Sequence, residues 1–415
     1  MLLLPLVLPL LQQPMADATP LRPYALTDVH VVRAETGDVL QHQTLLIEGG
    51  KIVAMGSAER MVVPQGFVDL EVQGKFLTPG FVDAHAHFPG NSGLDVPPED
   101  YLRMMVANGI TRLRCMRLEE GMSDWSHHIE MGQVVGPHLM LPLGLLSGEG
   151  ELQGEALDAV LQRNAGRKHG FFKMLGGFEE EAYREVVAKI VDAGFEVVGH
   201  LPRGISLTVA AEAGQSGIEH FQGFTLSEDY AEEELVSLVR REKEVGRYHC
   251  PTIHWVAVQG GNYDLERLEA LPGIEQVAPA QREAWRRWWG DEEELPRRER
   301  LQSYRKRMLT LLGEMGRQEL PLLLSASDGD YVVPGYSIHE EVALYVEAGL
   351  SPQAILQAIT SNAAASLHAE GQWGTVAVDA VADLVVLDAN PLLDAQALKG
   401  VQGTMVGGRW YKAAH

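Results

Sequence analysis

The sequence predicts an α/β protein: a (β/α)8 TIM-like barrel plus a small β domain, expected as a β-sandwich, formed from both chain ends. Residues 79–370 alternate between short apolar strand patterns and helical patterns, and repeated β–α units of this kind indicate a parallel sheet. The two chain ends show short strand patterns without a helical period. We therefore expect a signal peptide at 1–18, the β-sandwich at 19–78 and 371–415, and the barrel at 79–370.

Composition sets limits on the partners. Of the 415 residues, 46% are hydrophobic and 22% are charged, which is an ordinary globular balance. The formal net charge of −23 argues against a nucleic-acid partner, which would need a basic face. Cys115 and Cys250 are too few for a disulfide framework or a cysteine metal site. We expect a small-molecule substrate, and a homo-oligomer stays open.

The first residues are typical of an exported protein. Residues 1–11 are almost wholly apolar, and Ala16-Asp17-Ala18 follows, as in a secretory signal peptide with its cleavage site. The run is too short for a membrane span. No Lys or Arg precedes it, which is unusual for such a peptide. We expect a periplasmic or secreted protein; the alternative is a cytoplasmic protein with a mis-chosen start or an apolar tail.

Strand patterns justify the β domain. Near the start, turns such as Gly49-Gly50 separate them, and near the end Gly407-Gly408 does so. The expected strands are 29–32, 44–47, 51–55, 68–72, 382–387 and two within 400–411.

Eight strand candidates justify the barrel. The first ends at His85 and His87, and seven more follow it. Helical patterns separate several of them, at 178–193, 207–213 and 230–245, and Ser351-Pro352 is a typical helix start. In a (β/α)8 barrel the active site lies at the C-terminal strand ends. The seven later strands are 110–116, 139–143, 171–175, 196–200, 217–220, 248–252 and 322–328.

Metal-ligand residue types stand at these strand ends. His85 and His87 are two residues apart, so on a strand they point the same way. Imidazole is the commonest protein ligand for zinc-like metals, although two ordinary histidines on one strand face would read the same. The other strand ends carry Lys173, His200, His220 and Asp328.

Lys173 lies inside the apolar run Phe171-Phe172-Lys173-Met174-Leu175. Burial of an ammonium is costly and favours the neutral amine. A neutral amine can react with carbon dioxide to give a carbamate, whose two oxygens could bridge two metals. The alternative is a lysine that pairs with a carboxylate or reaches the rim.

With these residues in place, the chain resembles the amidohydrolase superfamily of metal-dependent hydrolases. More narrowly it is similar to the branch with zinc-dependent Xaa-Pro dipeptidases (prolidase-like) and imidazolonepropionase relatives. The resemblance covers nearly the whole chain after residue 20. The matching segments are 77–87, 172–174, 198–200, 218–220, 327–328, 360–362, 374–376 and 382–388.

The resemblance implies a binuclear metal centre. His85, His87 and Asp328 would hold the more buried metal, and His200 and His220 the second. Carbamylated Lys173 and a hydroxide would bridge the two ions. Zinc suits this ligand mix best, and manganese, iron or cobalt would fit the same ligands.

The implied reaction is hydrolysis of an amide C–N bond, in a dipeptide (Xaa-Pro or similar) or an N-acyl amino acid. Asp328 would act as general base and then general acid. The alternatives are a lactone, a phosphotriester or a cyclic amide such as an imidazolone, and, more remotely, a non-catalytic scaffold. A deaminase is less favoured, because Lys173 argues for two metals.

Departures from the family pattern leave the substrate open. Cys115 follows Arg114 where the family often has Arg-Asp. Residues 147–150 contain no histidine where family members often have Gly-His, and residues 325–328 read Ser-Ala-Ser-Asp where Gly-Thr-Asp is more usual. A free substrate carboxylate would need an arginine or tyrosine near the mouth. The candidates, each with an ordinary surface or packing role as its alternative, are Arg114, Arg203, Tyr230 and Tyr336.

Overall fold

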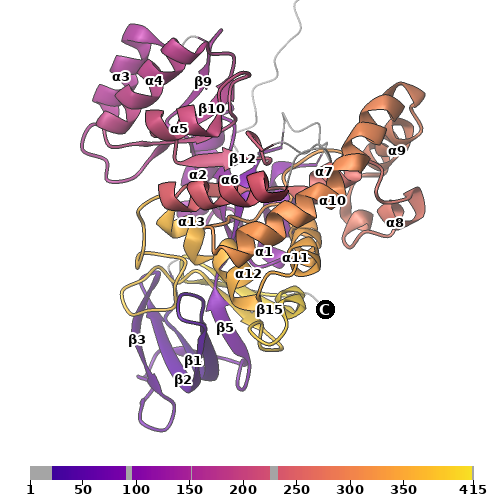
Figure 1. Cartoon of the computed structure of the whole chain (residues 1–415). Coiled ribbons are helices and arrows are strands. Elements are labelled where there is room, and N and C mark those ends of the chain that lie inside the picture. Colours follow the sequence, from indigo (N-terminus) through magenta and orange to yellow (C-terminus); the bar gives the residue numbers. More distant parts are fainter. Residues whose placement is uncertain (1–20, 90–95, 151, 225–231, 414–415) are drawn as a thin grey trace, which may run out of the picture.

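The computed structural model describes residues 21–89, 96–150, 152–224 and 232–413 (Figure 1). The predicted signal peptide at 1–18 and Tyr230 lie outside these ranges. No helix in the described ranges is long and apolar enough to cross a membrane.

Both chain ends form one mixed sheet, which occupies the lower part of Figure 1. The two ends meet where β5 (Phe76–Pro79) pairs antiparallel with β14 (Leu384–Leu387). All its strands belong to this single hydrogen-bonded sheet, so the common β domain from both ends is observed, while a sandwich stays a prediction. The other strands are β1 (Tyr24–Arg33), β2 (Asp38–Glu48), β3 (Lys51–Ser57), β4 (Val68–Leu70), β15 (Val401–Val406) and β16 (Arg409–Lys412).

The middle of the chain contains two parallel sheets. One is ordered β6-β7-β8 and the other β13-β12-β11-β10-β9. Every residue of β6 is buried, as expected of a strand covered on both faces. The strands are β6 (Phe81–Ala86), β7 (Ile110–Cys115), β8 (His138–Met140), β9 (Gly144–Ser147), β10 (Phe171–Gly176), β11 (Glu196–Gly199), β12 (Gly217–Glu219) and β13 (Tyr248–Cys250).

Residues 322–324 link the free edges of these sheets. Leu322 forms a parallel bridge with His249 of β13. On the other side, the Ala84 N–H of β6 donates to the Leu324 carbonyl at 3.1 Å, and the Ser325 hydroxyl donates to Asp83 Oδ1 at 2.5 Å. This segment therefore stands where the eighth strand was predicted.

The predicted third strand is divided. We expected one strand over 139–143, but β8 ends at Met140 and pairs with β7, whereas β9 begins at Gly144 and pairs with β10. The prediction of its bounds was wrong, because an apolar run does not show where a strand changes neighbours.

Helices pack around the parallel strands. In α4, Tyr183, Val186, Val187 and Ile190 form a buried stripe at helical spacing. The predicted start of α12 is confirmed, because Ser351 Oγ accepts from the Ala354 N–H. The helices are α1 (Pro98–Ala107), α2 (Met122–Glu130), α3 (Gly154–Asn164), α4 (Glu180–Asp192), α5 (Leu207–Ala213), α6 (Glu232–Val245), α11 (Ser337–Glu347), α12 (Pro352–Ile359) and α13 (Ser361–Ala365).

A helical insertion follows β13. In Figure 1 its helices α8 and α9 project from one side of the molecule. Trp285 of α9 is fully buried, with its ring centre 5.1 Å from that of Tyr331, so it has a packing role in a small core of the insertion. Residues 290–294 separate α9 from α10. The helices are α7 (Ile253–Gln259), α8 (Leu265–Glu269), α9 (Pro279–Trp289) and α10 (Leu295–Arg317).

An ionic network around the buried Asp383 joins the parallel strands to the mixed sheet. We call Arg112, Glu130, His138 and Asp383 the junction network. Asp383 lies 2.7 Å from Arg112 and 3.2 Å from His138, and it accepts the Gly407 N–H at 2.7 Å. His138 also contacts Glu130 at 2.6 Å. Each charge in the network therefore has a partner inside the protein.

Candidate metal centre

One pocket of about 480 Å³ is lined by all six residues predicted as metal ligands, namely His85, His87, Lys173, His200, His220 and Asp328. They come from β6, β10, the ends of β11 and β12, and the turn after 322–324. Ring centres are 4.5 Å apart for His85 and His220 and 5.3 Å apart for His200 and His220. Residues far apart in the sequence thus converge at the C-terminal strand ends.

Each of the four imidazoles is held by its Nδ1 atom. His85 Nδ1 lies 2.7 Å from Glu219 Oε2, and His220 Nδ1 lies 2.6 Å from Thr252 Oγ1. His200 Nδ1 donates to the Leu175 carbonyl at 3.2 Å, and His87 Nδ1 lies 3.2 Å from Asp328 Oδ1. Glu219, Thr252 and the Leu175 carbonyl can fix their histidine rings so that Nε2 is presented to a metal, whereas Asp328 is itself a candidate ligand.

The protonation of these rings also suits a metal. Burial lowers the pKa of His200 to about 4, and it lowers the pKa values of His85 and His220 well below the usual value. The positive charge of Lys173 acts in the same direction on all three. These histidines are therefore neutral at neutral pH, which is the form that coordinates metals.

Lys173 is buried without a protein partner. Its side chain is 1% exposed, and Nζ makes no hydrogen bond within the part of the chain that the structure describes. Burial lowers its pKa to about 8, Arg114 acts in the same direction, and Glu219 opposes them. An amine of this kind is partly neutral near pH 8 and therefore competent to react with carbon dioxide.

Arg114 lies beneath the pocket and does not line it, contrary to the prediction that it binds substrate. Its Nη2 donates to Glu219 Oε1 at 2.7 Å, and its Nε donates to the Ala84 carbonyl at 2.6 Å. The other oxygen of Glu219 holds His85. Arg114 and Glu219 therefore form a buried pair that supports a candidate ligand.

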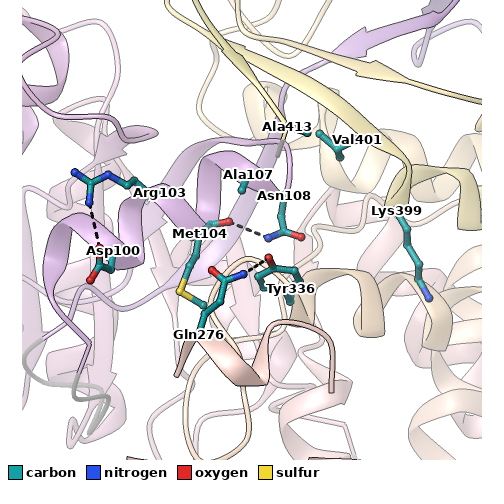
Figure 2. Close-up of a pocket in the computed structure, with 10 residues that line it drawn as sticks. All are labelled: Asp100, Arg103, Met104, Ala107, Asn108, Gln276, Tyr336, Lys399, Val401 and Ala413. Atoms are coloured by element: carbon teal, nitrogen blue, oxygen red, sulfur yellow. Dashed lines mark hydrogen bonds and ion pairs between the residues drawn. The ribbon is translucent and has the colours of Figure 1, made fainter. Parts of the chain in front are cut away.

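Of the other predicted substrate contacts, Arg203 and Tyr336 are not among the residues that line the pocket, and Tyr230 lies outside the described residues. Arg203 is exposed after β11 and is absent from the lining. Tyr336 accepts a hydrogen bond from Gln276 in a different pocket, about 470 Å³, which Figure 2 shows beside Asn108 of the turn after α1. Strand-end position alone did not show which way these side chains point.

The family model for the amidohydrolase family matches residues 99–410. The chain belongs to the amidohydrolase family. This family generally uses divalent metal ions, and its members include hydrolases of C–N bonds.

Similar structures agree with a TIM-like barrel for this amidohydrolase. A bottromycin amidohydrolase is 22% identical and aligns over 95% of this chain and 88% of its own, with a TM-score of 0.71. A Xaa-Pro dipeptidase is 18% identical over 94% of this chain and 100% of its own, with a TM-score of 0.67. At these identities the likeness shows the fold.

Part of the chain is also similar to a curated protein that is named for a different reaction. An adenine deaminase of Listeria innocua is 27% identical in an alignment of length 209 that covers 43% of this chain. The match spans only 34% of the deaminase, so it says nothing of the remaining two thirds of that enzyme.

The donor set of this amidohydrolase fits two divalent metals in its chemistry. The unpartnered Lys173 amine and the neutral histidines are the observations that support the fit. Within the described ranges, no three histidine, cysteine, aspartate or glutamate side chains form a ready-made metal cluster. His87 and Asp328 contact each other, so binding of an ion there requires them to exchange this contact for contacts to the metal.

Backbone strain gathers around the same pocket. His220, Thr252 and Ser327 all have φ between 54° and 63°, in the left-handed region that non-glycine residues rarely adopt. They stand at the ends of β12, β13 and the 322–324 segment, and such strain is typical of functional sites. Of these three residues, His220 and Ser327 line the pocket, and Thr252 contacts His220.

Sequence reasoning missed several residues that line the pocket. Gln222 Oε1 accepts the Leu201 N–H at 2.6 Å and so ties the loops after β11 and β12 together. Each of them lies between the last two residues of a strand, or of the 322–324 segment, and five residues beyond its end, so inspecting all these positions would have included them. They are Met116, Arg117, Leu175, Gln222, Trp255 and Ser327.

Proposed function

We propose that this amidohydrolase is a metal-dependent enzyme that cleaves an amide C–N bond in a dipeptide, such as Xaa-Pro, or in an N-acyl amino acid. The observation that carries the proposal is the pocket itself. Four histidines, an aspartate and a buried lysine with an unpartnered amine line it together. No ordinary packing role accounts for an unsatisfied lysine at that place.

The residues divide between two metal positions. His85, His87 and Asp328 would hold one ion, and His200 and His220 the other, with carbamylated Lys173 between them. Zinc is the metal we would test first, followed by manganese, iron and cobalt. Two such ions would supply a water of lowered pKa and a Lewis acid for the scissile carbonyl.

The side chains of the pocket have separate tasks. Asp328 is partly exposed to the pocket, so its carboxylate can take a proton from the attacking water and return it to the leaving nitrogen. Glu219 and Thr252 hold His85 and His220 in orientation. Trp255 packs with its ring centre 5.4 Å from that of His220 and shields that wall from water.

A second candidate is hydrolytic deamination of a purine such as adenine. It is favoured by the adenine deaminase relatives, whereas the buried Lys173, without a partner among the described residues, favours amide hydrolysis, because it argues for two metals. Lactones, phosphotriesters and cyclic amides are served by the same kind of site, because metals and fold do not fix the substrate. A non-catalytic scaffold would bind no metal.

One experiment separates these candidates. The purified full chain is analysed for metal and assayed with Xaa-Pro and Xaa-Arg dipeptides, N-acyl amino acids, a lactone, a phosphotriester, an imidazolone and adenine. We expect about two metals per chain and turnover of the linear amides. Ammonia release from adenine alone would establish deamination instead, and absence of both metal and turnover would leave the scaffold.

A further inference from the structure

Arg117 brings a positive charge into the pocket. It stands two residues beyond the end of β7 and lines the pocket with all six candidate ligands. Its guanidinium is near enough to Lys173 to help lower the pKa of that amine. Unlike Arg114, which stands three residues earlier, Arg117 is exposed.

No partner within the described residues neutralises Arg117. The structure contains no hydrogen bond or ion pair to it there, although most other pocket groups are engaged. Two carboxylates that contact candidate ligands are already engaged: Glu219 is bound by Arg114 and His85, and Asp328 contacts His87. The guanidinium is therefore available to bind an anionic group of a ligand.

The rest of the lining limits what that anion belongs to. Met116, Leu175 and Trp255 give the pocket an apolar wall beside the polar ligand set. A guanidinium fork matches a carboxylate in two parallel hydrogen bonds. The pocket thus combines a guanidinium that is unpaired within the described part of the chain, the six candidate metal ligands and an apolar surface.

We infer that Arg117 binds the free carboxylate of the substrate, so that the enzyme acts on amides of amino acids with an unblocked carboxylate. The inference deepens the proposed amide hydrolysis and rests on it for the reaction. It assigns to Arg117 the specificity role that sequence reasoning gave to Arg114, Arg203, Tyr230 and Tyr336. The carboxylate is taken up at the mouth, while the apolar part of the substrate meets Trp255.

Two measurements test it, one of binding and one of turnover. Binding is measured by calorimetry with a reduced dipeptide analogue, in which CH2–NH replaces the amide, and with its C-terminal carboxamide. Turnover is measured as release of the acyl group from an N-acyl amino acid and from its carboxamide. The proteins are the wild type, Arg117→Ala, Arg117→Lys and Arg163→Ala, an exposed arginine on α3 outside the pocket.

We expect Arg117→Ala to weaken binding and kcat/KM for the carboxylate compounds about 10- to 100-fold, as for loss of a charge-assisted pair. The carboxamides should change less than about threefold, because they never had that pair. Arg117→Lys should lie between, and Arg163→Ala should match the wild type. Equal losses for carboxylate and carboxamide, or no loss for either, would overturn the inference.

The binding arm keeps the two proposals apart. If the wild type prefers the carboxylate analogue through Arg117 but cleaves no linear amide, the carboxylate site stands and the proposed reaction fails. If the wild type cleaves the amides with no preference for the carboxylate, the reaction stands and the role of Arg117 fails.

Discussion

The two ends of the barrel bury charge in different ways. At the end that meets the mixed sheet, the junction network pairs Arg112 and His138 with Asp383. At the opposite end, Lys173 has no partner within the described ranges. Strand β7 serves both ends, since Arg112 belongs to the junction network and Arg114 to the pair beneath the pocket.

The difference separates stability from function. A buried polar group that is satisfied inside the protein contributes to the fold, whereas one that is left unsatisfied is costly unless a ligand completes it. In TIM-like barrels the C-terminal strand ends carry the catalytic groups, and the other end is structural. Substitutions at the two ends should therefore change different measurements.

Lys173→Met should have the largest effect on activity. Without the amine the proposed carbamate cannot form, so we expect the metal content to fall and kcat/KM to drop by about 10³-fold or more. The metal-free variant should melt at the same temperature as the metal-free wild type or higher, because methionine removes an unpartnered buried ammonium. Metal analysis, kinetics and calorimetry check this.

The opposite result for Lys173→Met would contradict the contrast between the two ends. If Lys173→Met kept its metals and its turnover but lost stability, the lysine would be a structural residue, and the two ends of the barrel would be alike.

Asp328→Asn should separate metal binding from proton transfer. We expect the metals to remain largely bound, because an amide oxygen can still contact an ion, and kcat to fall about 10²- to 10⁴-fold with the loss of the general base and acid. Unchanged kcat in a metal-replete variant would exclude that role for Asp328.

Glu219→Gln should have mixed effects, because Glu219 stands between Arg114 and His85. Loss of a carboxylate that orients a ligand should weaken metal affinity about 10- to 100-fold. The unpaired Arg114 should also lower the free energy of unfolding by about 3–5 kcal/mol. Competition with a chelator and denaturant unfolding measure the two effects, and a loss of stability with full metal affinity would restrict Glu219 to a structural role.

Much of this organisation could be predicted from the sequence. The candidate ligands could be predicted because each stands at the C-terminal end of a strand that its own local sequence pattern marks. The parallel strands could be predicted from the alternation of strand and helix patterns. The burial of Arg114 against Glu219 could not be predicted, because Glu219 is 105 residues away and no local sequence pattern marks the pair. The division of the third strand and the lining by Arg117 likewise depend on which strands become neighbours.

His138→Gln should have the smallest effect on activity and a clear effect on stability. Although burial opposes it, Asp383 and Glu130 raise the pKa of His138 to about 9, from an ordinary value of 6.5. The folded state thus binds the proton more tightly, so this stabilisation is fully present below about pH 6.5 and is lost as the pH rises through about 9. The variant should be less stable than the wild type by on the order of 2–3 kcal/mol at pH 6, and the difference should shrink toward zero near pH 10.

Glu130→Gln is the matched control, because that side chain is 54% exposed and its ion pair should contribute less than about 1 kcal/mol. Denaturant unfolding between pH 6 and 10 measures the difference, and kcat/KM of the metal-loaded variant should stay within about twofold of the wild type, because the junction network shares no residue with the pocket lining. A pH-independent loss of stability would mean that His138 acts through packing alone, and a large loss of kcat/KM would mean that the two ends of the barrel are coupled.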